Sequence, residues 1–497
     1  MTDQIVSFLK DCLKNDNIEV YSNKVLSNGI KGKLYSYQEG HVIRLITILL
    51  KYHIALDNSD TGVGKTIMAI AVAWELNKRP FIICPKSVMY NWLNVCNYIG
   101  INYIDIVNLE TIKYGRTYIS TKFKARKKSK YFNISDGNYE WNLPSDVMII
   151  IDEAHRCKTY KTDNGKFLVS MKQLIQLKIP VLLLSATICE KISDMKIIFY
   201  LFDLINEIRY FNKYCRMIKN KYPQFRISRK NYIKRSDYQN ACDNANALIL
   251  SEEIKNFNSR IKIKDLGDKF PSNQWCAQQF VADEAAEIER AYAEISICFE
   301  KLKNNLSGNH LAMIQKLKQE IELKKIPIFI EQAQLLLEDR KSVIIFANYL
   351  DTINILCKIL NIKCKVVGDQ TAEERQRAID LFQINHEKII ILQVKAGNVG
   401  ISLHDIYGNH PRAVLLNFPD SAADLLQALG RAPRVGAKTP VIQRIVCVAN
   451  VEYEKNIMQN INRKLTNISC INDRDLNGYK YNINNGVRKN EKNKDYV

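Results

Sequence analysis

The sequence predicts an α/β protein with two parallel-sheet lobes in tandem and a helical insertion between them. Short apolar runs alternate with helical patterns in two separate groups, which indicates two sheets of buried parallel strands. The stretch between the groups, residues 188–340, contains long helical patterns instead. The length of 497 residues, with 46% hydrophobic and 25% charged residues, suits about three globular domains.

The predicted strands are short apolar runs, as expected of strands that are buried on both faces. In the first half of the chain these runs are 53–56, 81–84, 147–151 and 181–184. In the second half they are 343–346, 365–367, 389–392, 413–416 and 442–448. Helical patterns cover residues 67–76, 287–303 and 311–325.

These patterns divide the chain into five segments. We expect an N-terminal accessory segment (1–30), a first lobe (31–205), a basic helical insertion (206–325), a second lobe (326–470) and a tail (471–497). The tail is rich in Asn and Lys and poor in apolar residues, so we expect it to be disordered.

The composition argues against a membrane or secreted protein. No apolar run reaches the length of about 18 residues that a membrane span needs. Residues 1–10 lack the basic and apolar regions of a secretory signal. The thirteen cysteines are scattered without a C-x-x-C pair, so we interpret them as reduced core thiols rather than disulfides or zinc ligands. We therefore expect an intracellular protein of the cytoplasm or nucleus, with no membrane partner.

The positive charge is concentrated in two segments. Lys and Arg number 72 against 52 Asp and Glu, which gives a formal net charge of +20. Residues 122–130 hold six basic residues and no acidic one, and residues 209–235 hold ten basic residues and no acidic one. A local excess of this kind indicates a polyanion partner, such as nucleic acid or an anionic surface. The alternative is a set of solvated loops that reflects the Lys/Asn/Ile bias of an AT-rich genome.

Residues 59–66 (SDTGVGKT) form the first candidate site. They follow the predicted strand 53–56 and open the predicted helix 67–76, which is the context that a phosphate-binding loop requires. Lys65 would reach the β- and γ-phosphates, and Thr66 would ligate Mg²⁺. The strict pattern has glycine at position 59, where this chain has serine. The residues that would cradle the phosphates with their backbone are Thr61, Gly62, Val63 and Gly64.

The second candidate site, Asp152-Glu153-Ala154-His155, ends the predicted strand 147–151. The carboxyl ends of buried parallel strands are where α/β sheets bind ligands. Asp152 would hold Mg²⁺, and Glu153 would polarise an attacking water as a general base. The alternative is an acidic helix N-terminus that only complements the helix dipole. A phosphate loop in the same chain favours the catalytic interpretation, because hydrolysis needs both parts.

Two further motifs are less specific. Ser185-Ala186-Thr187 follows the predicted strand 181–184, where an ordinary turn is the alternative. The segment 427–434 carries two arginines three residues apart, which would share one face of a helix. Such an arginine can stabilise the transition-state charge of a triphosphate. From spacing alone, a surface helix is the favoured interpretation of this segment.

The order of these motifs resembles that of a known family. The chain contains, in sequence, Tyr37-Gln38, residues 61–66, 152–155, 185–187, Ala396–Gly400 and 427–434. This set resembles the motifs of the superfamily 2 helicases, with the D-E-A-H form of the Walker B box. Finer details resemble the Swi/Snf-type translocase branch: Pro85-Lys86-Ser87 before Trp92, 211–215, 260–271 and 430–441. The departures are Ser59, Gln393-Val394-Lys395 in motif V, and Ala437.

The resemblance implies two RecA-like lobes and Mg²⁺-dependent ATP hydrolysis, with ATP and Mg²⁺ as cofactors. It implies that Gln38 reads the adenine and that Ser185 and Thr187 couple hydrolysis to strand movement. It also implies that Gly400 lines the cleft for ATP and nucleic acid. The expected output is translocation on, or unwinding of, nucleic acid in transcription, replication or repair. The composition suggests a large DNA virus as the source, and a viral chain could also reside in the virion.

For the segment 427–434, the resemblance implies an orienting role for Gln427. It also implies that Arg431 or Arg434 is the arginine finger, the arginine that contacts the triphosphate. Arg434 is the one expected to lie closer to the triphosphate.

The nucleic-acid track is predicted from charge rather than from a motif. Segment 209–235 interleaves basic residues with six aromatic ones. We interpret the aromatic residues mainly as helical core and the basic residues as contacts to the phosphate backbone. DNA is favoured over RNA as the partner, with transcription or replication machinery as a further partner. The predicted contact residues are Arg209, Lys213, Arg216, Lys219, Arg226, Arg229 and Lys230.

Two alternatives belong to other functional classes. One is a P-loop NTPase with a substrate other than nucleic acid, and the paired lobes and segment 427–434 argue against it. The other is a nucleotide-binding module without turnover. The presence of Lys65, Asp152, Glu153 and Arg434 argues against that one.

Overall fold

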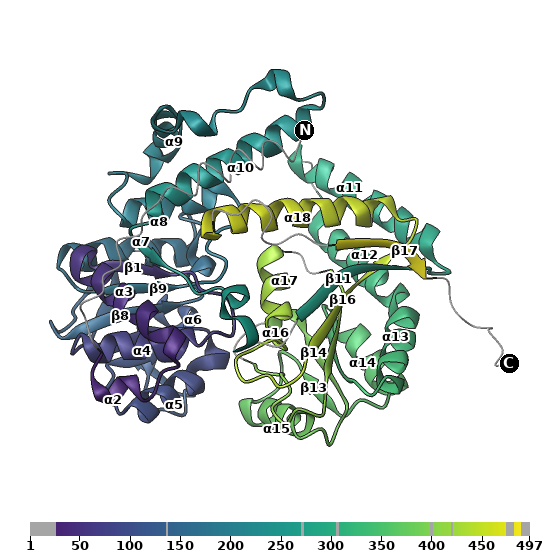
Figure 1. Cartoon of the computed structure of the whole chain (residues 1–497), viewed down its shortest axis with the longest axis horizontal. Coiled ribbons are helices and arrows are strands. Elements are labelled where there is room, and N and C mark those ends of the chain that lie inside the picture. The colour runs from purple at the N-terminus through teal and green to yellow at the C-terminus, as the bar shows by residue number, and fades with distance from the viewer. Residues whose placement is uncertain are drawn as a thin grey trace. The chain divides into compact units, whose positions relative to one another are not determined.

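A computed structural model describes residues 26–135, 138–269, 273–304, 308–397, 401–418, 421–473 and 482–488. The described chain divides into two compact units. Unit 1 comprises residues 26–266 together with 463–473, and unit 2 comprises residues 267–462 together with 482–488. Each unit is built around one parallel β-sheet (Figure 1). The predicted α/β class with two parallel-sheet lobes is therefore confirmed.

The sheet of unit 1 has six parallel strands in the order β10-β1-β9-β8-β2-β3. They are β1 (Ile54–Asp57), β2 (Arg79–Ile83), β3 (Asp105–Val107), β8 (Val147–Asp152), β9 (Val181–Leu184) and β10 (Asn258–Ser259). The four predicted strands of the first lobe correspond to β1, β2, β8 and β9, which are almost wholly buried. β3 and β10 are too short to give an apolar run.

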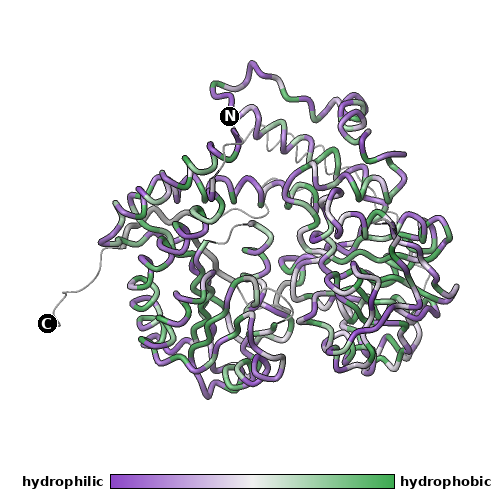
Figure 2. Tube along the Cα trace, turned by 180° about the vertical axis from the view of Figure 1, so that it is seen from behind, coloured by the Kyte–Doolittle hydropathy of each residue, from purple (hydrophilic) through white to green (hydrophobic). Residues whose placement is uncertain are grey.

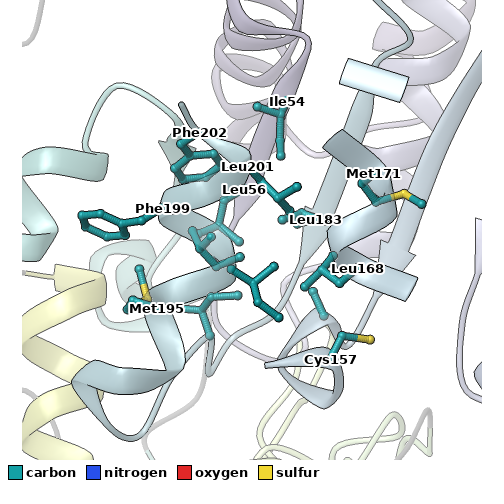
Figure 3. Packing of buried hydrophobic residues seen from close by; sticks show 14 of the residues in the cluster. Ile54, Leu56, Cys157, Leu168, Met171, Leu183, Met195, Phe199, Leu201 and Phe202 are labelled. Carbon is teal, nitrogen blue, oxygen red and sulfur yellow. The ribbon is translucent and has the colours of Figure 1, made fainter. Parts of the chain in front are cut away.

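Two groups of helices pack on this sheet. Helices α3 (Ser36–Tyr52), α4 (Lys65–Glu75) and α5 (Met89–Ile99) contact one another in succession and contact β1, β2 and β3 respectively. Helices α7 (Asp163–Gln176) and α8 (Lys196–Leu201) pack together, with α7 also against β9. Figure 3 shows the core between β1, β9, α7 and α8, with Leu56, Leu183 and Leu168 among its labelled side chains.

The rest of unit 1 connects these elements. The chain forms α2 (Asn28–Lys31) before α3, and α6 (Leu109–Ile112) after β3. Two antiparallel hairpins follow, β4 (Arg116–Tyr118) with β5 (Arg126–Lys128), and β6 (Phe132–Ser135) with β7 (Asn138–Trp141). Helices α9 (Phe211–Lys221) and α10 (Arg235–Ile254) follow α8.

The sheet of unit 2 has seven parallel strands in the order β13-β14-β12-β15-β16-β11-β17. They are β11 (Asn273–Phe280), β12 (Ser342–Ala347), β13 (Cys364–Val366), β14 (Ile389–Gln393), β15 (Arg412–Leu416), β16 (Val441–Val448) and β17 (Asn482–Arg488). Five correspond to predicted strands. β11 lies in a stretch that the sequence predicts as helical, and its polar residues give no apolar run. β17 lies in the tail that was expected to be disordered.

Helices of unit 2 flank its sheet and build a second core (Figure 1). They are α11 (Ala285–Lys303), α12 (His310–Lys324), α13 (Ile326–Glu338), α14 (Leu350–Ile359), α15 (Ala372–Gln383), α16 (Val394–Gly397), α17 (Ala422–Leu429) and α18 (Glu452–Asp473). The helices predicted at 287–303 and 311–325 correspond to α11 and α12. Residues 463–473 of α18 belong to unit 1.

The hydropathy pattern follows this architecture. Figure 2 shows hydrophobic residues concentrated along the strands of both sheets and hydrophilic residues along the outer helices and loops. Every cysteine that the structure describes with its side chain is free, and most are buried, as predicted. Within the described ranges, no helix combines the length and apolar character needed to cross a membrane.

Candidate active site

The phosphate loop, residues 58–66, connects β1 to α4 and requires glycine at two positions. Gly62 has a φ of 88° and Gly64 a φ of 93°, both in the left-handed region that side chains disfavour. Gly64 is also the N-cap of α4. A Cβ atom at position 64 would clash with the side-chain Nε2 of Gln38. Gly64 is therefore required both by its backbone conformation and by the close approach of Gln38.

Lys65 stands at the start of α4 and points back into the loop. Its Nζ donates hydrogen bonds to the carbonyl oxygens of Ser59 (2.8 Å) and Asp60 (3.0 Å). Burial lowers the pKa of Lys65, and the negative charges of Asp57, Glu153 and Asp152 oppose that shift. The ammonium thus lies in the field of the carboxylates of both motifs. The oxygens of a bound anion could accept hydrogen bonds from the Lys65 ammonium in place of the two carbonyl oxygens. The buried positive charge would then stay hydrogen-bonded.

Gln38 stabilises the phosphate loop through a hydrogen bond to its backbone. Its Nε2 donates to the carbonyl oxygen of Val63 at 2.8 Å, and its Oε1 accepts from the backbone N–H of Tyr35 at 3.0 Å. The hydroxyl of Tyr37 donates to the same Val63 carbonyl at 3.2 Å. The Gln38 side chain is buried. The structure places it against the loop, while the contact with adenine stays a prediction.

Ser59, the departure from the strict loop pattern, has a structural role. Its hydroxyl accepts a hydrogen bond from the backbone N–H of Ile261 at 2.9 Å, and the residue is fully buried. Glycine could not supply this acceptor, so Ile261 would keep a buried, unsatisfied N–H. Serine at position 59 therefore stabilises the contact between the loop and the segment that follows β10.

Arg260 links the phosphate loop to the end of α18, a relationship that the sequence analysis did not predict. Its guanidinium donates to Asp60 Oδ1 at 2.7 Å, to Asp473 and to the carbonyl oxygen of Asn58. All three charged side chains are largely buried. The only signal for Arg260 was the resemblance of residues 260–271 to a family element. Asp473 lay in the segment that was expected to be disordered.

Asp152 and Glu153 form a carboxylate pair at the carboxyl end of β8. Asp152 accepts hydrogen bonds from Trp92 Nε1 (3.1 Å) and from the backbone N–H of Glu153 (3.0 Å). Burial, and then the charge of Glu153, raises the pKa of Asp152, while Lys65 opposes that shift. A bound cation would relieve the repulsion between the two carboxylates. The donor set of Asp152 and Thr66 fits Mg²⁺, which prefers oxygen ligands.

The second and third motifs of unit 1 are joined through His155. The Nδ1 atom of His155 lies 3.2 Å from Glu153 Oε2 and 3.0 Å from the hydroxyl oxygen of Ser185. The same hydroxyl accepts from the backbone N–H of Thr187 at 3.3 Å. The Ser185 backbone N–H donates to the carbonyl oxygen of Asp57, at the start of the phosphate loop. The structure thus brings Lys65, Asp152, Glu153 and Ser185 together at one edge of the first sheet.

The predicted arginines lie in unit 2, just beyond a helix. Helix α17 ends at Leu429, so the expectation that both arginines share a helix face is wrong; Gly430 and the following turn interrupt the helix. Gln427 and Arg431 are buried. Arg434 donates to Ser402 Oγ at 2.7 Å and to the Gly430 carbonyl at 3.2 Å. Burial, and then the charge of Arg431, lowers the pKa of Arg434 to about 9.

The guanidinium groups of Arg431 and Arg434 are close together and partly desolvated, which costs free energy. An anionic ligand would offset that cost. This electrostatic property is what the predicted arginine finger requires. Gly400, the remaining predicted residue of this lobe, lies outside the described residues.

The basic segment 209–235 is largely exposed and is anchored by aromatic residues. Phe211 and Phe225 are buried, as predicted for core aromatics, whereas Tyr210 is exposed. Tyr214, Lys221 and Tyr222 all donate hydrogen bonds to the Glu253 carboxylate on α10. The seven predicted contact residues are exposed: Arg209, Lys213, Arg216, Lys219, Arg226, Arg229 and Lys230. Arg209 pairs with Glu207, and Arg229 donates to the Tyr232 carbonyl oxygen. Contact of the seven side chains with a phosphate backbone stays a prediction.

Comparison with known protein families gives one match in each unit. A family model described as type III restriction enzyme, res subunit, matches residues 31–190. A model described as helicase conserved C-terminal domain matches residues 324–436. The first match contains the phosphate loop and residues 152–187, and the second contains Gln427, Arg431 and Arg434.

Three known proteins illustrate the similarity. A protein of Acanthamoeba polyphaga mimivirus named "Putative ATP-dependent RNA helicase" is 56% identical over 498 residues, which covers 98% of this chain and 93% of the relative. The human DNA repair and recombination protein RAD54B is 30% identical over 131 residues, 24% of this chain and 14% of its own. A solved SWI2/SNF2 ATPase core of Sulfolobus solfataricus in complex with dsDNA is 19% identical, covers 93% of this chain and 96% of its own, and has a TM-score of 0.32.

Proposed function

The chain belongs to the superfamily 2 helicases, which are nucleic-acid-dependent ATPases, and we propose that it uses ATP hydrolysis to translocate along a nucleic-acid backbone. The match to RAD54B supports the expected Swi/Snf-like branch, and the mimivirus relative is consistent with the expected viral origin. A P-loop enzyme of another class and a module without turnover are not favoured by these relatives.

The observation that carries the proposal is the joint placement of Lys65 and the Asp152–Glu153 pair at one edge of the first sheet. Lys65 would exchange its bonds to the Ser59 and Asp60 carbonyl oxygens for phosphate oxygens of ATP. The N–H groups at the start of α4 would hold the phosphates, because this end of the helix carries partial positive charge. Binding of ATP is thus expected to release two internal hydrogen bonds of the loop.

The two carboxylates would divide the work of hydrolysis. Asp152, with Thr66, would hold Mg²⁺, which when bound supplies positive charge to the phosphate oxygens. Glu153 would accept a hydrogen bond from the attacking water and orient it, as a general base. His155 contacts both Glu153 and Ser185. A movement of the Glu153 carboxylate during hydrolysis would therefore be passed directly to the segment 185–187. Arg434, beside Arg431, would neutralise transition-state charge in the triphosphate.

The nature of the polymer is the finer part of the proposal. Exposed basic residues along α9 and the segment after it would hold phosphates rather than bases, which suits a motor that must pass over any sequence. We propose duplex DNA, in line with the Swi/Snf-like motifs. The mimivirus relative is named an RNA helicase, so both polymers belong in the experiment.

A displacement experiment separates the candidates. The full chain is given ATP and Mg²⁺ with a DNA duplex carrying a third-strand oligonucleotide, with partial DNA duplexes, and with the matching RNA duplexes. Displacement of the third strand without separation of the duplex strands would support translocation on DNA. Separation of RNA strands alone would contradict the choice of DNA. Glu153→Gln is the inactive blank, and Glu140→Gln, an exposed glutamate on β7, is the matched control.

A further inference from the structure

The hairpin formed by β4, β5 and their connecting turn, residues 116–130, carries a charge that the active site does not use. Its 15 residues include seven basic ones and no acidic one. All seven side chains are exposed. They are Arg116, Lys122, Lys124, Arg126, Lys127, Lys128 and Lys130.

None of these seven cations forms an ion pair with a carboxylate in the part of the chain that the structure describes. Some basic side chains elsewhere in unit 1 do pair with carboxylates, as Lys158 does with Asp194 and Lys221 with Glu253. An ordinary solvated surface intersperses both signs of charge. A single-sign surface of this size therefore calls for an anionic partner from outside the chain.

The hairpin is firmly built, unlike a loose solvated loop. Phe123, in its turn, is buried although its φ of 50° lies in the left-handed region. Its ring packs edge-on between Tyr90 (5.2 Å between centroids) and Tyr118 (5.5 Å). The Tyr90 hydroxyl donates to the carbonyl oxygen of Lys122 at 3.0 Å. A bulky residue keeps such a conformation only where the surroundings impose it, so the turn is held in one shape.

The root of the hairpin lies beside β3. The Tyr118 hydroxyl donates to Asn108 Oδ1 at 2.8 Å and accepts from the Thr111 hydroxyl at 3.1 Å. Asn108 follows the carboxyl end of β3, and Tyr90 is near the start of α5, which follows the carboxyl end of β2. Because all six strands are parallel, this is the edge at which the phosphate loop follows β1.

Strand order sets the distance between the hairpin and the triphosphate site. β9, β8 and β2 lie between β1 and β3. Four inter-strand spacings of about 4.8 Å place β3 about 19 Å from β1. The hairpin is therefore on the edge of the sheet where the active site lies, and its root beside β3 is four strand positions from the phosphate loop. A long polyanion could contact the hairpin while the loop holds ATP.

We propose that residues 116–130 form a second site for the phosphate backbone of nucleic acid in unit 1, separate from segment 209–235. This inference rests on the proposed function, because it assumes that nucleic acid is the substrate of the motor. The lysine side chains would contact phosphates without reading bases. The site would add affinity and salt dependence to nucleic-acid binding without taking part in ATP hydrolysis.

The test variant replaces four hairpin lysines, of which Lys130 lies 5.0 Å from the centroid of the Tyr131 ring and the other three have no ring contact or ion pair among the described residues. Arg126, which lies over the Tyr118 ring, and Lys127, which lies near Asp105, are kept. The variant carries Lys122→Gln, Lys124→Gln, Lys128→Gln and Lys130→Gln. The control variant removes the same charge from four exposed lysines elsewhere in unit 1: Lys161, Lys166, Lys178 and Lys191.

Binding of a fluorescent duplex, of a fluorescent single strand and of fluorescent polyglutamate is measured from 50 to 300 mM salt, together with ATPase activity without polymer. In the hairpin variant, the slope of log affinity against log salt should become shallower by about 3.6 on duplex or about 2.8 on a single strand. The control variant should shift this slope much less, and the ATPase activity without polymer should be unchanged in both.

Three outcomes overturn the proposal. Equal slopes for the wild-type chain and the hairpin variant would exclude a backbone contact at the hairpin. Equal slopes for the hairpin and control variants would show that only total charge matters. Loss of binding to polyglutamate with nucleic-acid binding retained would assign the hairpin to an acidic protein. A wild-type chain that binds no nucleic acid would instead contradict the proposed function itself.

Discussion

Arg260 donates a 2.7 Å hydrogen bond to Asp60 of the phosphate loop and also pairs with Asp473 at the end of α18. The two acidic partners are more than 400 residues apart in sequence. Asn472 adds a parallel link, because its side chain donates to the Ala186 carbonyl at 2.8 Å and accepts from Asn58 at 3.3 Å. The end of α18 therefore stabilises both the phosphate loop and the segment 185–187.

Removing Arg260 should destabilise the protein strongly. Arg260→Ala removes the buried cation that Asp60 and Asp473 share and keeps only the more exposed Lys262, 3.4 Å from Asp473, which costs about 3–5 kcal/mol. We expect a lower thermal midpoint and a raised KM for ATP. The control is Arg79→Ala, because Arg79 pairs with Asp146 at 2.7 Å with both side chains about half exposed. Thermal unfolding that responds equally to both variants would contradict the role of Arg260.

Replacing Ser59 by alanine should cost stability although the loop pattern tolerates small residues there. The variant removes the hydroxyl that accepts the Ile261 N–H, so a buried donor loses its partner at about 1–3 kcal/mol. Chemical denaturation measures the loss, with Ser145→Ala, an exposed serine, as the control. A Ser59→Ala variant as stable as the control variant would show that water or a shift of the loop satisfies Ile261.

Gly64→Ala should abolish ATP binding while the fold of both units is kept. The new Cβ would clash with Gln38 Nε2, and the backbone φ of 93° is unfavourable for alanine. Adding Gln38→Ala to this variant should relieve the clash but not the backbone strain. Because Gln38 is itself predicted to contact adenine, Gln38→Ala alone is the reference, and the double variant is expected to bind a fluorescent ATP analogue more weakly than this reference. Equal binding by the double variant and Gln38→Ala would show that the clash alone demands glycine.

Glu253 should stabilise the basic segment in a manner that depends on pH. Burial opposes its charge, but hydrogen bonds from Lys221, Tyr214 and Tyr222 hold its pKa below the ordinary value of 4.5. A lowered pKa in the folded state means that the stabilisation is complete above about pH 4.5 and is lost as the pH falls through the folded-state value.

Glu253→Gln should therefore lower the free energy of unfolding at pH 7 by about 1–3 kcal/mol. The difference from the wild-type chain should shrink as the pH falls below 4.5. Urea unfolding at a series of pH values measures both effects. A difference that is independent of pH would show that shape rather than charge anchors α9 on α10.

Arg434→Lys should reduce kcat with little effect on ATP binding. Lysine keeps a positive charge but lacks the planar fork that contacts phosphate oxygens in two places. Loss of an arginine finger lowers kcat by about 10³-fold or more. Arg377→Lys, an exposed arginine on α15 of the same unit, is the control. A kcat within twofold of the wild-type value would assign Arg434 a structural role through Ser402.

The apolar strands were predictable because a strand buried on both faces needs an uninterrupted apolar run. The runs 147–151 and 181–184 correspond to β8 and β9 almost residue for residue. The phosphate loop was predictable for a related reason, since its glycines and Lys65 stand between a strand and a helix.

β11 could not be predicted in this way. It carries Gln278 and Gln279, which are buried in a parallel pairing with β16. An apolar run marks a strand only when hydrophobic side chains cover both faces, and amide side chains break that pattern. The same limit applies to Arg260, whose partners Asp60 and Asp473 come from distant parts of the chain, so no local spacing connects them.

The steady-state ATPase rate as a function of nucleic-acid concentration tests the central claim most directly. The wild-type chain and Glu153→Gln are compared with ATP and Mg²⁺ at low salt, and ATP binding is measured for both. We predict that nucleic acid strongly stimulates the wild-type rate and that Glu153→Gln binds ATP but does not turn it over. A wild-type rate that is unaffected by DNA and RNA, or an undiminished rate in Glu153→Gln, would contradict the account.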